Sequence, residues 1–442
     1  MARTTPLQTL LILAITATAQ QIGPIPELHP LLPTQQCTTA GGCTTRRTSL
    51  VTDALSRPFH AAGDPSVPCN TTPLNATLCP DAATGDYAAS CGRRGSAVTL
   101  RQYLFDGAAY KSVSPRVYLL AEDGENYEGL RLLNQELAFD VDLSRLGCGM
   151  NGPLYLSEMG LDGGRGELNP AGAGYGTGYC DAQCFRPNMN NSGACCNEMD
   201  IWEANSQATV FTPHTCSRSG SFLCAGDECD RTPAGSGVCD KNGCGINTYG
   251  LGAQRFYGPG LAVDTSRPFT VVTQFFTIDN SSTGTLSEIK RLYIQDGKVI
   301  PNTAETTNAA VKGIAGGYEG ALTQDYCTAR NTSDFLRLGG LKGMGESLAR
   351  GMVLVFSIWN SPGDFMSWLD GENNGPCNAT AGDPARIVEL TPDVSVTFSN
   401  IRWGDLGSTF NASSSGASAR AGVGTTASMV VGFAVLLVAF LP

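Results

Sequence analysis

The sequence is short of the residues that metal centres and nucleic-acid-binding surfaces require. It has only three histidines, too few for a histidine-rich metal site, and no pair of C-x-x-C motifs lies at zinc spacing. Charged residues make up 16% of the chain, and the net charge is −11. Because no basic patch is present to neutralise phosphates, we expect no nucleic acid as a partner. A lightly charged, acidic surface instead suits a neutral substrate.

Signs of helices, repeats and linkers are equally scarce. Only residues 344–352 are a fair helix candidate, and no Pro/Ser/Thr-rich linker leads to a second domain. The chain does contain 53 glycines and 24 prolines, which indicate many turns. Strand candidates, marked by apolar–polar alternation or by β-branched and aromatic residues, are 137–143, 269–278, 352–359 and 394–398. Asp123-Gly124 predicts a hairpin turn. Together these features predict an all-β fold, a sandwich or jelly roll.

Residues 1–19 have the pattern of a secretory signal peptide. Arg3 supplies the positive start, residues 7–15 form a short apolar core, and residues 17–19 are a small-x-small cleavage site. The alternative, an uncleaved membrane anchor, would need about 20 apolar residues. We therefore expect a secreted, extracellular protein whose mature chain begins near residue 20.

The other end of the chain carries a second targeting pattern. An uncharged apolar tail occupies residues 428–442, and small residues and a polar spacer precede it from Asn411 onward. This order is typical of a glycosylphosphatidylinositol (GPI) anchor signal, so we expect residues 411–442 to tether the protein at the cell surface. The alternatives are a weak membrane tail and a disordered end. Residues 20–410 remain, enough for one large all-β domain.

Seventeen cysteines behind a signal peptide predict a disulfide framework rather than metal sites. N-x-S/T sequons agree with passage through the secretory pathway. They begin at Asn70, Asn75, Asn190, Asn280, Asn331, Asn378 and Asn411.

Three carboxylates, Glu198, Asp200 and Glu203, lie within six residues. Cleavage of a glycosidic bond needs two, one to attack or stabilise the sugar C1 and one to protonate the leaving oxygen. On a regular strand Glu198 and Asp200 share a face, and Glu203 points away. A β-bulge at 199–202 would turn Glu203 back, and bulges are common beside active sites. We therefore expect Glu198 to be the nucleophile and Glu203 the general acid/base, with Asp200 orienting Glu198 and sharing its proton.

Acids this close cannot all ionise easily, so at least one pKa must rise, which keeps an acid protonated for the leaving group. The adjacent Cys195-Cys196 pair would hold the start of the strand rigidly, as a catalytic site requires. The alternative is three exposed acids on a solvated strand edge, because short acidic motifs also arise by chance. Carboxylates suffice for this chemistry, so we expect no cofactor and no metal.

The segment around these acids resembles glycoside hydrolase family 7, the fungal cellobiohydrolases and endoglucanases. The family's E-x-D-x-x-E motif stands here as Glu198-Met-Asp-Ile-Trp-Glu203. Similarity runs along almost the whole mature chain, from Gln20 to Ser408. The matching blocks include 139–143, 171–184 and 352–359.

The resemblance implies a concanavalin-like jelly-roll β-sandwich with long loops that form a substrate groove, and a monomeric retaining enzyme that acts on a β-1,4-glucan chain. It implies the same roles for the three acids and places His214 beside the leaving group. The implied substrate-binding residues are Tyr179, Asp181, Gln183, Tyr155, Arg116, Trp359 and Trp368.

Without the resemblance, these residues have plainer interpretations. A lone histidine is more often structural, because one imidazole has many ways to be satisfied. The alternate positions 179, 181 and 183 would make the polar face of a strand. Either tryptophan would pack in a core.

Departures from the cellobiohydrolase pattern favour an open groove and attack on internal bonds. Ser56 and Pro58 stand where cellobiohydrolases carry tryptophan, and Gly250 stands where they place an arginine. The segment between Cys184 and Cys195 is also short. Against this, the loop 216–244 and the block 325–327 look like the cellobiohydrolase form. We expect an endo-β-1,4-glucanase; the alternatives are an exo-acting cellobiohydrolase and a non-catalytic wall protein or lectin on the same sandwich.

The resemblance also implies seven disulfides. They are Cys37–Cys43, Cys148–Cys377, Cys180–Cys196, Cys184–Cys195, Cys216–Cys239, Cys224–Cys229 and Cys244–Cys327. Cys69, Cys79 and Cys91 are left over, and sequence alone leaves their pairing open.

Overall fold

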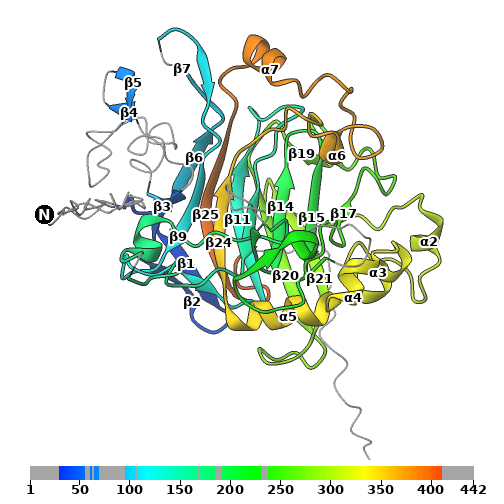
Figure 1. The fold of residues 1–442 in the computed structure, drawn as a ribbon. Coiled ribbons are helices and arrows are strands. Elements are labelled where there is room, and N and C mark those ends of the chain that lie inside the picture. Colours follow the sequence, from blue (N-terminus) through cyan, green and yellow to red (C-terminus); the bar gives the residue numbers. More distant parts are fainter. Residues whose placement is uncertain are drawn as a thin grey trace, which may run out of the picture.

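The protein folds as two β-sheets packed face to face, surrounded by short helices and long loops (Figure 1). This computed structural model describes residues 29–410 except 55–59, 62–63, 69–94, 106, 168, 185–191 and 230–236. Several sequence predictions lie outside the described residues. They concern the signal peptide, the tail 411–442, Ser56, Pro58, the short segment after Cys184, the three left-over cysteines, and the sequons at Asn70, Asn75, Asn190 and Asn411.

The sheet that contains the acidic motif, the groove sheet, has the strand order β17-β15-β14-β12-β24-β9-β3, and β10 pairs with β24. Its described strands are β3 (Ser49–Thr52), β9 (Arg116–Leu120), β10 (Gly129–Leu130), β12 (Leu154–Ser157), β14 (Glu198–Ala204), β15 (Thr209–His214), β17 (Ile246–Asn247) and β24 (Met352–Ser357).

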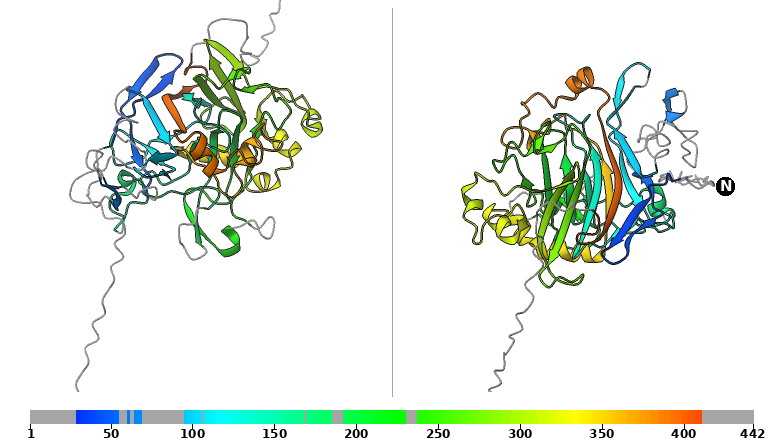
Figure 2. Two further views of the ribbon diagram at one scale, coloured as in Figure 1. Left: turned by 90° about the horizontal axis from the view of Figure 1, so that it is seen from above. Right: turned by 180° about the vertical axis from the view of Figure 1, so that it is seen from behind.

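The second sheet, the back sheet, has the order β2-β1-β25-β11-β20-β21-β22, with β6 on β25 and β23 on β21. Its described strands are β1 (Thr34–Thr38), β2 (Gly42–Arg46), β6 (Ala97–Arg101), β11 (Gln135–Asp142), β20 (Phe269–Thr277), β21 (Leu286–Gln295), β22 (Lys298–Pro301), β23 (Leu322–Thr323) and β25 (Ser395–Asp405). The last strand, β25, lies between the N-terminal β1, to which it runs parallel, and β11 (Figure 2). The predicted all-β sandwich is confirmed.

Among the described residues, four small two-stranded ladders lie outside the two sheets. They are β4 (His60–Ala61) with β5 (Asp64–Pro68), β7 (Tyr103–Phe105) with β8 (Tyr110–Ser112), β13 (Ser192–Cys195) with β16 (Phe222–Ala225), and β18 (Tyr257–Gly258) with β19 (Val263–Asp264).

The core between the sheets explains the alternating sequence patterns. Leu137, Phe139 and Val141 of β11 lie in it, and so do Val396 and Phe398 of β25. Every second residue of these strands therefore faces the opposite sheet, as period-two alternation requires.

The continuous apolar run of β24 has a different cause. Leu354 and Phe356 belong to the core between the sheets, whereas Val353 and Val355 belong to a second apolar cluster. A strand that is covered on both faces has no solvent side, so it is apolar at successive positions.

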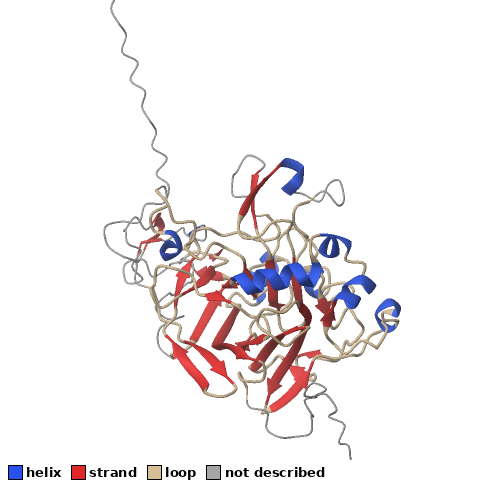
Figure 3. Ribbon diagram, turned by 90° about the horizontal axis from the view of Figure 1, so that it is seen from below, coloured by secondary structure: helices blue, strands red, loops and turns tan. Residues whose placement is uncertain are grey.

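Helices lie around the edges of the sheets rather than between them (Figure 3). The described ones are α2 (Ala309–Lys312), α3 (Gln324–Ala329), α4 (Ser333–Arg337), α5 (Gly340–Arg350), α6 (Ser367–Asp370), α7 (Pro384–Leu390) and the 3-10 helices η2 (Gly172–Tyr175) and η3 (Gly226–Cys229). Among the residues that the structure describes, no helix has the length and apolar character needed to cross a bilayer.

Two local predictions needed adjustment. The predicted helix at 344–352 forms, but α5 starts at Gly340 and ends at Arg350, because Gly351 adopts a positive φ of 102° and Met352 opens β24. The Asp123-Gly124 turn also forms, but only the single bridge Leu120↔Tyr127 closes it.

All seven implied disulfides are present. The bridges are Cys37–Cys43, Cys148–Cys377, Cys180–Cys196, Cys184–Cys195, Cys216–Cys239, Cys224–Cys229 and Cys244–Cys327.

Candidate active site

A groove of about 990 Å³ runs over the groove sheet on the side away from the main core. Every catalytic and substrate-binding candidate from the sequence lines it: Glu198, Asp200, Glu203, His214, Tyr179, Asp181, Gln183, Tyr155, Arg116, Trp359 and Trp368. Residues from β9, β12, β14, β15 and β24 meet there because their outward-facing positions share one side of the sheet.

The acidic strand β14 contains a bulge in its middle. Against β15 the register shifts between Asp200 and Glu203, so that Ile201 and Trp202 together face the single residue Phe211. A bulge of this kind inserts one extra residue and bends the strand locally. The bulge expected at 199–202 is therefore present.

The bulge decides where the third acid points. Ile201 and Trp202, although adjacent, are both fully buried in the core between the sheets. After the bulge, the alternation of side chains between the two faces is shifted by one residue. Glu203 therefore lines the same groove as Glu198 and Asp200. On an unbulged strand Glu203 would face the core instead.

The two glutamates are held by different neighbours. Glu198 Oε2 accepts a hydrogen bond from the backbone N–H of Ala182 at 3.0 Å. Glu203 Oε1 accepts one from Asn151 Nδ2 at 2.9 Å. Each glutamate is thus fixed by a donor from a distant segment, which leaves its second oxygen available to a bound substrate.

Asp200 and His214 share a proton. His214 Nδ1 lies 3.0 Å from the carbonyl oxygen of Asp240, which only accepts hydrogen bonds, so Nδ1 carries hydrogen. His214 Nε2 lies 3.1 Å from Asp200 Oδ2. Two bare lone pairs at that distance would repel, so a second proton lies between them, on the carboxyl or on the ring. In either form the pair carries no net charge.

Burial and mutual repulsion raise the pKa of all three groove acids. Burial, with repulsion from Asp200, raises the pKa of Glu203 to about 8. Burial, with repulsion from Asp181, raises the pKa of Asp200 to about 8. Burial and the carboxylates of Asp200 and Asp181 also raise the pKa of Glu198, against His214 and the Ala182 N–H, which lower it. These directions agree with the expectation that acids so close cannot all ionise.

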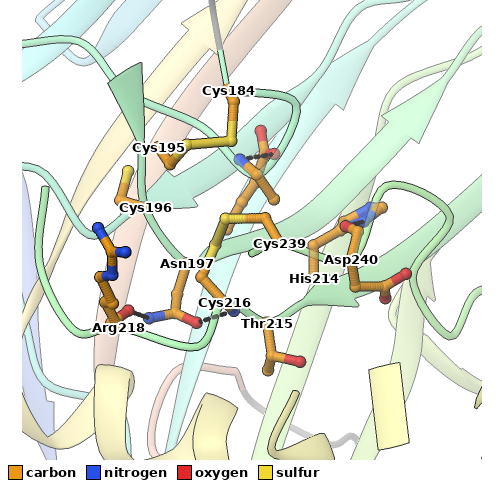
Figure 4. Close-up of a disulfide and its surroundings, with 12 residues drawn as sticks. Cys184, Cys195, Cys196, Asn197, His214, Thr215, Cys216, Arg218, Cys239 and Asp240 are labelled. Atoms are coloured by element: carbon orange, nitrogen blue, oxygen red, sulfur yellow. Dashed lines mark hydrogen bonds between the residues drawn. A yellow bond between two sulfur atoms is a disulfide. The ribbon is translucent and has the colours of Figure 1, made fainter. Parts of the chain in front are cut away.

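Disulfides fix the segment in front of β14. Cys184–Cys195 and Cys216–Cys239 lie side by side (Figure 4). Cys180–Cys196 joins the same short segment to the residues just before Glu198. These bridges hold residues 180–184 against the start of the strand. The Ala182 N–H that contacts Glu198 is therefore supplied by a covalently anchored loop.

Within the described part of the chain, two clusters bring potential metal ligands within 4.8 Å of one another. One is Cys184, Cys195 and Cys239, and the other is Cys148, Asp370 and Cys377. All of these cysteines are in disulfides, and a disulfide sulfur lacks the thiolate charge with which cysteine binds metals. The residues present do not fit a metal site at either place.

Arg116, Tyr155 and Tyr179 form one connected group in the groove wall. The guanidinium carbon of Arg116 lies 3.3 Å from the centre of the Tyr179 ring, and Arg116 Nη2 pairs with Asp53 Oδ2 at 2.8 Å. The hydroxyls of Tyr155 and Tyr179 lie 3.0 Å apart. These interactions hold the Tyr179 ring in a fixed orientation in the groove.

The expectation of a polar strand face at 179, 181 and 183 was wrong, although all three side chains line the groove. The segment is irregular, with a single bridge between Asp181 and Cys195. The flanking disulfides and the positive φ values of Gly178 (86°) and Cys184 (57°) prevent an extended strand.

Trp359 and Trp368 form a stacked pair at another part of the groove. Their ring centres lie 6.2 Å apart with an interplanar angle of 24°, and Trp368 remains 38% exposed. An exposed, fixed indole face suits stacking on a sugar ring. The backbone of Trp359 exchanges two hydrogen bonds of 2.9 Å with Asn151, the residue that donates to Glu203. The tryptophan pair is thus linked to the Glu203 end of the acidic row.

Sequence reasoning missed three residues that support the side chains of the groove. Asn151 is fully buried and contacts Glu203 from more than fifty positions upstream. Lys241 Nζ donates to the carbonyl of Ala182 at 3.0 Å. Of the three, only Asp53 left a usable signal, because an arginine expected in the groove, such as Arg116, calls for a carboxylate partner.

A row of acids with raised pKa values and aromatic rings in one groove of a β-sandwich is typical of a carboxylate-dependent glycosidase. Comparison with known proteins agrees with this class. The chain belongs to glycosyl hydrolase family 7, whose family model matches residues 23–410.

Relatives and solved structures cover most of the chain. A protein named "Probable endo-beta-1,4-glucanase celB" from Aspergillus terreus is 56% identical over 409 residues, 88% of this chain and 94% of that protein. The native endocellulase EGI of Humicola insolens is 42% identical with a TM-score of 0.75, covering 88% of this chain and 99% of that one. A family 7 cellobiohydrolase from Daphnia pulex is 32% identical with a TM-score of 0.75, over the same shares.

Proposed function

We propose that this protein is a secreted, retaining endo-β-1,4-glucanase that cleaves internal bonds of cellulose and related β-glucans by double displacement. The observation that carries the proposal is the bulge of β14, which brings Glu203 into one groove with Glu198 and Asp200. Endo attack is supported by the higher identity to a relative named as an endoglucanase, 56%, than to a solved cellobiohydrolase, 32%.

In the first step a carboxylate oxygen of Glu198 attacks the sugar C1. The bond from C1 to the glycosidic oxygen breaks, and the departing oxygen takes the proton of Glu203. The high pKa of Glu203, about 8, supports this role, because the group holds its proton over the acidic and neutral range. The product of this step is a glycosyl ester on Glu198.

In the second step the ionised Glu203 acts as a base. It takes a proton from water, the water oxygen attacks C1, and the bond between C1 and Glu198 breaks. Two inversions at C1 restore the original anomer. Glu203 is again protonated and Glu198 is again a carboxylate, so the cycle closes without a cofactor.

Asp200 and His214 keep the nucleophile ionised. Asp200 as a free carboxylate would repel the charge of Glu198 and raise its pKa. Because the Asp200–His214 pair holds one proton and is neutral overall, much of that repulsion is removed. The Ala182 N–H further stabilises the carboxylate form of Glu198.

The groove has two functional ends. We assign the leaving sugar to the end with Trp359 and Trp368, because Trp359 is joined through Asn151 to the acid Glu203. The other end, with Tyr179 and Arg116, would bind the sugars that stay attached to Glu198. Gly250 lines the groove without a side chain, which supports an open path for a chain that continues in both directions.

The test is hydrolysis of a soluble cello-oligosaccharide and of a soluble cellulose derivative by wild type, Glu198→Gln and Glu203→Gln. The control is Glu346→Gln, an exposed glutamate of α5 whose ion pair among the described residues is with Lys342. We expect loss of about 10⁴-fold or more in Glu198→Gln and no change in the control. Rapid viscosity loss and first products of the β anomer would support internal, retaining attack. Release of cellobiose alone would reject endo attack, and α products would reject retention.

We further propose that residues 1–19 are a cleaved signal peptide, 20–410 the catalytic domain and 411–442 a tail with a GPI signal. The family match over 23–410 agrees with the middle segment. N-terminal sequencing of the mature protein, and its release from cells by a phospholipase specific for phosphatidylinositol, would test the two ends. Size-exclusion chromatography with light scattering would test the expected monomer.

A further inference from the structure

The bulge leaves one residue of β14 outside both neighbouring ladders. Against β12, Leu154 pairs with Trp202 and Leu156 with Met199, and the register shifts between them. Against β15 the shift also spans Ile201. Ile201 is therefore the extra residue on both sides of the strand. Its buried carbonyl needs a partner from elsewhere, because an unsatisfied buried acceptor costs about 1–3 kcal/mol.

That partner comes from the opposite sheet. Arg291 of β21 projects across the core, is 1% exposed, and donates from Nη2 to the carbonyl oxygen of Ile201. Its Nε donates to Thr273 Oγ1 on the neighbouring strand β20 at 3.2 Å. The same guanidinium lies 4.6 Å from the ring of Phe211 and 5.6 Å from the ring of Trp202. Arg291 thus contacts all three residues of the bulge.

A buried arginine at this place is costly as a packing residue. No carboxylate of the described residues lies within ion-pair distance of Arg291, and Nη1 has no hydrogen-bond partner there. Burial lowers the pKa of Arg291, against the effect of the Tyr293 and Tyr257 phenols. An apolar side chain of similar volume would avoid this desolvation. Such a substitute could not make the hydrogen bonds of Arg291, and the charge-assisted bond to the Ile201 carbonyl is the one that reaches the bulge of β14.

We propose that Arg291 is a positioning residue for catalysis: by binding the Ile201 carbonyl across the core, it holds the bulge that turns Glu203 into the groove. This inference rests on the role of Glu203 as the general acid. Glu203 is two residues from Ile201, whereas Glu198 lies before the bulge and has its own anchor at Ala182. Loss of Arg291 should therefore misplace the acid more than the nucleophile.

Two substrates with different leaving groups distinguish a displaced acid, Glu203, from a displaced nucleophile, Glu198. Phenyl β-cellobioside needs a proton from the acid when its aryl oxygen departs, whereas dinitrophenyl β-cellobioside releases a stable anion without one. A displaced acid therefore slows only the first substrate. General damage to the fold, or a displaced nucleophile, slows both alike.

The experiment measures kcat/KM of Arg291→Met and Arg291→Lys on both substrates, at a temperature where each variant is fully folded. We expect Arg291→Met to lose about 10²-fold on the phenyl substrate and less than about threefold on the dinitrophenyl substrate. Arg291→Lys, which keeps a charge and a donor, should show a smaller loss of the same kind. Val396→Ala, which cuts a buried side chain of β25 in the same core, is the control for stability and should lose equally on both.

Equal losses on the two substrates in the Arg291 variants would overturn the inference. Glu203→Gln on the same pair separates this result from a failure of the proposed function. If Glu203→Gln is not selective for the phenyl substrate, the assignment of the acid is wrong. If it is selective and the Arg291 variants are not, only the positioning role is wrong. If Arg291→Met fails to fold, Arg291→Lys and Thr273→Val take its place. Thr273→Val removes the second hydrogen bond of Arg291. The positioning role is then supported if these two variants lose more activity on the phenyl substrate than on the dinitrophenyl substrate, and it is rejected if the losses are equal.

Discussion

Asn151 lowers the pKa of Glu203, the proposed general acid, against burial and Asp200, which raise it. The side chain donates to Glu203 Oε1 at 2.9 Å and stabilises the ionised carboxylate. A hydrogen bond to a charged group contributes about 1.5–3 kcal/mol, and 1.36 kcal/mol corresponds to one pKa unit. Because Glu203 is half-buried, water can replace part of the lost interaction. We expect Asn151→Ala to raise the pKa of Glu203 by about one unit, from about 8 toward 9.

The direction in which the pH profile of Asn151→Ala should move follows from the proposed role of Glu203 as a general acid. A general acid must be protonated, so the rate is constant below the pKa of Glu203 and falls as the pH rises through it. In Asn151→Ala the basic limb of kcat/KM should therefore move to higher pH. The plateau should also fall by about tenfold, because the acid loses a support. The assay is hydrolysis of a cello-oligosaccharide between about pH 4 and 11, and kcat/KM reports the free enzyme.

The matched control is Asn247→Ala. Asn247 lines the groove, and its amide donates to the carbonyls of Leu369 and Asn374 rather than to an acid. Its basic limb should stay at the wild-type pH. If the limb of Asn151→Ala stays there too, or moves to lower pH, the reasoning about the Asn151–Glu203 contact is refuted.

Three further predictions concern the acids and the framework. Above about pH 8 Asp200 loses its proton, and its negative charge then raises the pKa of Glu203. Asp200→Asn cannot carry that charge, so the basic limb of kcat/KM should move to lower pH, opposite to the shift in Asn151→Ala. Glu136, fully buried in β11, accepts hydrogen bonds from Gln274, Gly407 and Thr409. Glu136→Ala should therefore lower the free energy of unfolding in urea by about 3 kcal/mol and leave KM unchanged. The Cys148–Cys377 bridge closes a sequence separation of 229, and replacing both cysteines by alanine should lower the free energy of unfolding by up to about 5 kcal/mol. The same replacement of Cys224–Cys229, with a separation of 5, should lower it by about 2 kcal/mol. Thermal melting of the two variants would show the difference.

The fold class and the acidic row could be predicted because their signals are local. Strands that face one core alternate in sequence, as in β11 and β25, and a strand covered on both faces is apolar throughout, as in β24. The bulge was also readable, since only an inserted residue brings Glu203 to the side of Glu198. The disulfide pairs came from the resemblance, because spacing alone does not determine connectivity.

What sequence reasoning missed depends on contacts between distant segments. Asn151 and Arg291 reach the acidic strand from a neighbouring loop and from the opposite sheet, and no periodicity marks either of them. The segment 179–183 was misjudged for a related reason. Its alternating polar residues suggested a strand, but two disulfides and left-handed backbone at Gly178 and Cys184 impose an irregular path.

The position of β25 has a consequence for the order in which this chain can fold. Until residues 395–405 leave the ribosome, the described back sheet consists of two separate ladders, β1 with β2 and β11 with its neighbours, and the single strand β6. Each ladder then presents an open edge of unpaired backbone groups, the kind of edge that pairs with other chains. Domains generally fold as units during synthesis, but here the two halves can join only when the final strand inserts between them. A product truncated before Ser395 would be expected to aggregate rather than to persist as a smaller, active enzyme.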